Sequence, residues 1–114
     1  MELQLIASKI YEIRGQRVIL DADLAELYGI ETKALNQSVR RNKDRFPQDF
    51  MFILNEKDLQ GMRSQFLTAS RAKRNITALP FAFTEHGVTM LASVLRSEIA
   101  IKMNISIVRA FVTL

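Results

Sequence analysis

The sequence predicts an α+β domain in which a helix-turn-helix is supported by a small antiparallel β-sheet, with two packed C-terminal helices. Three observations predict this fold class. Two β-prone runs flank Gly15, helical periodicity interrupted by Gly29 follows at once, and two amphipathic stretches come after Pro80. A length of 114 residues with 48% hydrophobic content suits one core, so we take residues 1–114 as a single domain.

Composition removes several classes of protein. The chain has no cysteine, which excludes disulfides, thiolate nucleophiles and cysteine-ligated metals, and this favours a reducing, cytoplasmic setting. The segment Met1–Gln4 carries an acid where a secretory leader carries basic residues. The longest uncharged stretches, such as His86–Leu95, fall well short of the ~20 apolar residues of a membrane helix. We therefore expect a soluble protein without a membrane partner.

The first elements are a hairpin and two short helices. Ile10–Ile13 and Arg17–Leu20 are β-prone, and the intervening Gly15 suits a tight turn. Asp21 is the expected N-cap of a helix that Gly29 ends. A second helix is predicted from about Glu31 to Asn42. Its inward residues are Leu35 and Val39, and Pro47 prevents it from continuing.

The middle of the chain predicts a strand, a helix and a loop. Phe50–Leu54 is a short apolar run between Pro47 and Asn55, which indicates a buried strand that could pair with the hairpin. Asn55, with Asp58 three residues later, predicts the start of a helix reaching about Phe66. Residues 68–78 lose apolar periodicity, so we expect a surface loop there.

The C-terminal part predicts an extended run and two helices. Phe81–Phe83 looks extended, Thr84 is the expected N-cap of one helix, and Ser97 that of the last. The last helix has one narrow polar stripe, formed by Lys102, Ser106, Arg109 and Thr113. Its broad apolar surface must be covered. Since it runs to Leu114 without a stop signal, we expect an N-terminal piece of a longer protein, or a partner helix.

The segment Asp21–Val39 meets the requirements of a DNA-binding helix-turn-helix. Two steeply crossing helices need a small residue at their closest approach, a glycine in the turn, and apolar residues between them. Ala25 and Gly29 meet the first two needs. The expected packing residues are Leu24, Tyr28, Ile30 and Leu35, with Val39 beside the last expected position at Ser38. An ordinary helical hairpin with the same glycine turn remains an alternative.

Positive charge is concentrated in two segments. The net charge is +4, but Glu31–Arg45 holds five basic and two acidic residues, and Gln60–Ile76 holds four basic and no acidic ones. This distribution suits double-stranded DNA as partner, and two solvated basic surfaces without a partner are the alternative. The predicted DNA-binding residues are Thr32, Lys33, Asn36, Gln37, Arg40, Arg41, Lys43, Arg71, Lys73 and Arg74.

These residues divide by the chemistry they offer. Asn36, Gln37 and Arg40 are the types that read base edges in the major groove. Thr32 and Lys33, at the helix start, would meet base edges or phosphates. Arg41, Lys43 and Arg45 suit phosphate, and Arg71, Lys73 and Arg74 would add phosphate or minor-groove contacts from the loop.

The sequence predicts no enzyme and no cofactor. His86 is the single histidine, so a site with two histidine ligands is impossible, and no cysteine can replace the second one. Glu85 is its neighbour, but adjacent helical residues point about 100° apart, so the two make no ready dyad. The glycines stand alone and form no phosphate-binding loop. We expect no catalytic residue and no metal site.

Several longer motifs resemble those of the phage ORF-six amino-terminal domain, a relative of the KilA-N and antirepressor-type DNA-binding domains. They are DADLAELYG at 21–29, TKALN at 32–36, RRNKDRFPQDF at 40–50, PFAFTEHGV at 80–88, and the apolar stretch at 100–112. The likeness spans nearly the whole chain. It implies a structural role for the third motif, with Phe46 and Phe50 in the core and Arg45 and Asp49 as a candidate pair.

The resemblance also implies a function. It implies a DNA-binding module of phage or prophage regulatory proteins, without catalytic activity or cofactor, in the cytoplasm of a bacterial cell or phage-infected host. The alternative is an antirepressor-type interaction module that binds a repressor protein through the C-terminal helix. The same helix, Ile99–Leu114, is the expected seam of a homodimer.

Overall fold

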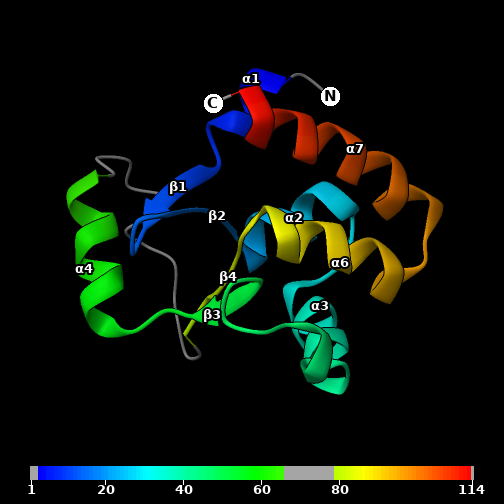
Figure 1. Ribbon diagram of the computed structural model, residues 1–114, viewed down its shortest axis with the longest axis horizontal. Coiled ribbons are helices and arrows are strands. Elements are labelled where there is room, and N and C mark those ends of the chain that lie inside the picture. The colour runs from blue at the N-terminus through cyan, green and yellow to red at the C-terminus, as the bar shows by residue number, and fades with distance from the viewer. Residues whose placement is uncertain (1–2, 66–78, 114) are drawn as a thin grey trace.

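The computed structural model describes residues 3–65 and 79–113 and shows a small sheet with helices on both faces (Figure 1). In chain order the elements are α1 (Leu3–Ala7), β1 (Ile10–Ile13), β2 (Gln16–Leu20), α2 (Asp21–Tyr28), α3 (Thr32–Arg41), the 3-10 turn η1 (Lys43–Arg45), β3 (Met51–Ile53), α4 (Glu56–Gln65), β4 (Phe81–Phe83), α6 (Glu85–Leu95) and α7 (Glu98–Thr113). The short helix α1 was not predicted from the sequence.

The sheet has four antiparallel strands in the order β1-β2-β4-β3. The predicted hairpin is present, and the predicted 50–54 strand joins the same sheet, but the two do not pair with each other. β4 lies between them, so that Ile19 is opposite Phe83 and Phe52 is opposite Ala82. All three residues of β4 are buried, as expected for a central strand. The sequence predicted that residues 81–83 are extended, but it did not predict that they form a strand in the middle of the sheet.

The two faces of the sheet carry separate cores. Along β2, Ile19 packs with α2, α3, α6 and α7, whereas Val18 and Leu20 belong to the opposite cluster. The helix α4 contributes Leu59 and Met62 to that opposite cluster. Strand side chains alternate between faces, so one short strand serves both cores. The predicted fold class is confirmed, including the two packed C-terminal helices α6 and α7 (Figure 1).

Three predicted helix caps are confirmed and one is wrong. Thr84 Oγ1 accepts the Gly87 N–H, and Ser97 Oγ accepts the Ala100 N–H. Asn55 and Asp58 cap α4 reciprocally, because each side chain accepts the backbone N–H of the other at 2.8 and 2.9 Å. Asp21 is not the N-cap of α2 but its first residue, and the N-cap, Leu20, has no side-chain bond. The carboxylate of Asp21 is buried instead.

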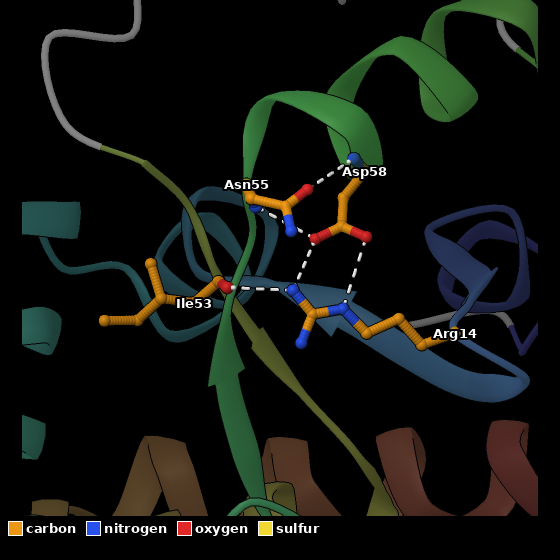
Figure 2. Close-up of polar contacts among 4 residues, drawn as sticks. All are labelled: Arg14, Ile53, Asn55 and Asp58. Carbon is orange, nitrogen blue, oxygen red and sulfur yellow. Dashed lines mark hydrogen bonds and ion pairs between the residues drawn. The ribbon is translucent and has the colours of Figure 1, made fainter.

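The turn of the hairpin holds α4 in place (Figure 2). Arg14 and Gly15 form a two-residue turn in which both φ angles are positive, at 55° and 74°. The Arg14 guanidinium donates to both carboxylate oxygens of Asp58, at 2.7 and 3.2 Å, and lies 4.6 Å from the Phe52 ring centroid. A positive φ is unfavourable for a residue other than glycine. The contacts with Asp58 and Phe52 offset this cost at Arg14.

The Arg14–Asp58 pair predicts an acid-sensitive contribution to stability. The hydrogen bond from Arg14 lowers the pKa of Asp58 below its ordinary value of 3.8. A carboxyl group with a lowered pKa stabilises the fold above its unfolded pKa, and this contribution is lost as the pH falls through the folded one. Asp58→Asn should therefore melt below the wild type at pH 7, and the difference should shrink below about pH 4. Thermal melts at both pH values test this, and an equal difference at both would contradict it.

Candidate nucleic-acid interface

α2 and α3 are joined by a short turn centred on Gly29. Gly29 has a φ of 71°, its N–H bonds to the Glu26 oxygen, and the Ile30 N–H bonds to the Ala25 oxygen at 3.0 Å. This bonding pattern is a helix C-cap that glycine favours because it has no Cβ. Ile30 is 38% exposed, so it is less buried than the other predicted packing residues. Leu24, Tyr28 and Leu35 are buried as predicted, and Val39 is buried while Ser38 is half-buried.

The exposed face of α3 carries a ridge of polar and cationic side chains. Successive helical residues lie about 100° apart, so residues four apart share a face. Leu35 and Val39 are buried on the inner side. On the opposite side Lys33, Gln37 and Arg41 are exposed and follow one another at this spacing. These three residues are called the α3 ridge below. Arg40, also exposed, lies beside it.

Asn36 lies on the inner side of the helix and is not available as the predicted base contact. Its Nδ2 donates to Asp21 Oδ2 at 2.8 Å, and its Oδ1 is buried. The same Asp21 oxygen accepts the Phe81 N–H at 3.1 Å. Asp21 is 1% exposed, so this bond joins the helix to α2 and β4 inside the protein. Asn36 therefore fixes the position of α3. A signal was present in the sequence, since Asn36 precedes the inward Val39 by three residues.

The other predicted contact residues follow α3 to its end. Thr32 is half-buried in the first turn, and Lys43 is exposed in η1. The Arg40 guanidinium lies over the Phe81 ring, 5.3 Å from its centroid. This cation–π contact holds the Arg40 side chain against β4. Arg45 is exposed and its Nη1 is 3.4 Å from Ser93 Oγ. Arg71, Lys73 and Arg74 lie outside the described residues.

The motif at 40–50 joins α3 to the sheet. Phe46 is buried and meets Phe83 edge-on, with ring centroids 6.1 Å apart. Phe50 is half-buried and stacks on the exposed His86 at 5.2 Å. Arg45 contacts Ser93 of α6, and the backbone oxygen of Asp49 accepts a hydrogen bond from Thr84 Oγ1 at 2.6 Å. The motif therefore has the structural role that the resemblance implied, although Arg45 is directed to Ser93 in place of Asp49.

Buried polar contacts make α2 a fixed support for α3. The Tyr28 hydroxyl donates to Asn104 Oδ1 of α7, and Asn104 Nδ2 donates to the Val88 oxygen of α6 at 2.7 Å. Burial raises the pKa of the Tyr28 phenol above its ordinary value of 10.0. At the other end of α2, Asp23 lies 3.6 Å from Lys9 Nζ. Three helices are thus tied together by groups that have little contact with water.

Within 3–65 and 79–113, no group of three or more histidine, cysteine, aspartate or glutamate side chains is placed to hold a metal ion. Across the same ranges, no helix has the length and apolar character needed to cross a bilayer.

Comparison with known proteins identifies the family. The family model described as the ORF6N domain matches residues 8–94, a range that contains α2, α3, the whole sheet and nearly all of α6. Neither the curated proteins nor the solved structures gave a match. The matched range covers most of the chain and includes every motif described above except the stretch at 100–112. The chain therefore belongs to the ORF6N domain family.

Proposed function

We propose that this chain is a DNA-binding domain of a phage or prophage regulatory protein, in which α2 and α3 form the helix-turn-helix and α3 enters the major groove. The observation that carries this proposal is the α3 ridge. Lys33, Gln37 and Arg41 are exposed together on a helix whose inner side is fixed by Leu35, Val39 and Asn36. A rigid helix with amide and cationic side chains outward is what base reading requires.

The distribution of acids supports the proposal. α3 contains no acidic residue, and the two aspartates of α2, Asp21 and Asp23, are buried in internal contacts. Glu26 of α2 is exposed, and Glu31 and Asp44 bring exposed negative charge to the two ends of α3, against five basic residues in 31–45. The surface therefore presents a net positive field to a polyanion.

Roles within the site follow from position. Gln37, at the centre of the α3 ridge, is the residue placed to read a base, and glutamine pairs with the N6 and N7 edge of adenine. Lys33 and Arg41 flank it and would bind phosphates on either side, joined by Lys43 beyond the helix. Arg40 would reach the groove edge from its position over Phe81.

The contrast between Gln37 and its neighbour Asn36 gives a test of these roles. Gln37→Ala should leave stability unchanged and reduce preference for one base pair, by ~1–3 kcal/mol. Asn36→Ala should lower the free energy of unfolding by ~1.5–3 kcal/mol, because it removes a hydrogen bond to a buried carboxylate. Urea denaturation and binding to a selected operator, measured for both variants, separate the two. A stability loss in Gln37→Ala with no change in base preference would contradict the assignment.

DNA binding itself is tested by a fluorescence-anisotropy titration of random-sequence duplex DNA at 50 mM and 200 mM salt. Neutralising phosphates releases counterions, so affinity should fall steeply with salt, by roughly 0.9 log units of affinity per log unit of salt for each phosphate contact. A folded domain that fails to bind at low salt would refute the proposal. Binding that ignores salt would also refute it.

A binding role without catalysis is part of the proposal. His86, the one histidine of the chain, is exposed and its ring is stacked on Phe50.

A second candidate function, an antirepressor-type interaction module, is favoured by one observation, the exposed apolar face of α7. The two functions use different elements, so one chain can perform both.

A further inference from the structure

The outer face of α7 exposes large apolar side chains. The inner face of this helix is formed by the buried residues Ala100, Asn104, Ile107, Ala110 and Phe111. On the outer face Ile101, Ile105 and Val112 are 48%, 50% and 71% exposed, and Val108 is half-buried. Leaving so many large apolar groups together in water is unfavourable, and a patch of this kind commonly marks a binding surface.

The exposed residues have the spacing of a coiled-coil seam. Starting from Glu98, the positions 98, 101, 105, 108 and 112 alternate at intervals of three and four residues. Four of these five residues are Ile or Val, and they are called the α7 seam below. The short helix α1 packs against α7 (Figure 1), and its Leu3 and Leu5 are 40% and 51% exposed. This pattern fits a helix laid along α7, as opposed to a flat protein surface.

Charge beside the seam selects the kind of helix. Lys102 and Arg109 are both exposed and, being seven residues apart, lie along the same edge of the α7 seam. In an antiparallel pair with a second copy, Lys102 of each chain would face Arg109 of the other. The pair would therefore contain two repulsive contacts between positive charges. In a parallel pair, the heptad positions facing this edge would be Ser97 and Asn104; Asn104 is buried in the core, and neither residue carries a negative charge. A second copy is therefore a poor electrostatic match.

We propose that the α7 seam binds an amphipathic helix of a partner protein that has apolar residues at heptad spacing and Asp or Glu along the edge facing Lys102 and Arg109. In Figure 1, α7 lies at the top of the molecule and α3 at the bottom, with α2 and α6 between them. The two surfaces therefore do not overlap, and the domain can hold its partner while the α3 ridge is occupied. This inference does not depend on what α3 binds.

Two synthetic helices test the proposal. Both carry the same Leu and Ile heptad seam, and their flanking positions hold Glu in one and Lys in the other. Titrated with the full chain by fluorescence anisotropy, the Glu peptide should bind at least about tenfold more tightly than the Lys peptide. Lys102→Glu/Arg109→Glu should reverse that order. Because the reversal is a gain of binding to the Lys peptide, misfolding cannot produce it. Ile105→Glu should bind neither peptide while retaining a wild-type circular dichroism spectrum.

Several outcomes would overturn the inference. Equal binding of the two peptides, or no binding of either to the folded chain, would remove it. Sedimentation that shows a wild-type dimer abolished by Ile105→Glu would make a second copy the occupant of the seam. Titrating the same variants with duplex DNA distinguishes this surface from the one proposed above, because the seam substitutions should leave the contacts of α3 with DNA in place.

Discussion

Replacing Gly87 by alanine is expected to unfold the domain or to lower its free energy of unfolding by about 3 kcal/mol or more. A Cβ at Gly87 would lie 2.0 Å from the carbonyl oxygen of Phe50 and 2.9 Å from its carbon. These are backbone atoms, and the same oxygen accepts the Thr84 N–H at 3.0 Å. No flexible side chain is available to move aside, so the first turn of α6 would have to separate from the strand segment at Phe50.

A matched control is Gly61→Ala in α4. Among the residues that the structure describes, and leaving aside the backbone of α4 itself, no atom lies within 4 Å of a Cβ at Gly61, which is exposed in the interior of a helix. Alanine there should be neutral or stabilise the protein by up to about 1 kcal/mol, because glycine is a poorer helix former. Urea denaturation of both variants measures the contrast. Equal midpoints for the two would show that the approach of Gly87 to Phe50 is not required.

The second large effect is expected in DNA binding by Lys33→Ala/Arg41→Ala. This variant removes both cations of the α3 ridge and leaves the buried contacts of α3 intact. Loss of two phosphate contacts should lower the slope of log affinity against log salt by about 2 and weaken binding at 0.1 M salt roughly tenfold or more. The melting temperature should remain close to that of the wild type, because exposed charges contribute little to stability.

The control for this variant is Lys102→Ala/Arg109→Ala. It removes the same amount of charge from exposed positions on α7, on the other side of the molecule from α3 (Figure 1). Long-range electrostatics alone would weaken DNA binding by the same amount in both variants. A large loss confined to the α3 variant is expected. Comparable losses in the two would mean that net charge, and no particular surface, accounts for binding.

The local features of this fold could be predicted from the sequence because each depends on residues a few positions apart. The caps at Thr84 and Ser97 bond to N–H groups three residues later, and the Asn55–Asp58 box is equally local. Gly29 ends α2 because its left-handed φ continues the chain in a new direction at little cost. Helical spacing, with Leu35 and Val39 assigned to the core, predicted an outward face formed by Lys33, Gln37, Arg40 and Arg41, to which it wrongly added Asn36.

The rest depends on contacts between segments far apart in the chain. Asp21 has the residue type of an N-cap, but its buried bonds reach Asn36, 15 residues away, and Phe81, 60 residues away. No local pattern specifies these partners, so Asp21 was assigned the wrong role. Asn36 was given an outward role, although its spacing of three residues to Val39 indicated that it lies toward the inner side. The position of β4 in the sheet could not be predicted for the same reason, and neither could the side of α7 that faces the core.

The most direct test of the central claim is a map of backbone amide shifts by NMR as duplex DNA is added at low salt. If α3 is the DNA-binding helix, the largest shifts should fall on Lys33, Gln37 and Arg41 and their immediate neighbours, while the amides of α7 stay nearly unchanged. Shifts concentrated on α4 or α7, with those of α3 at the background level, would contradict the account.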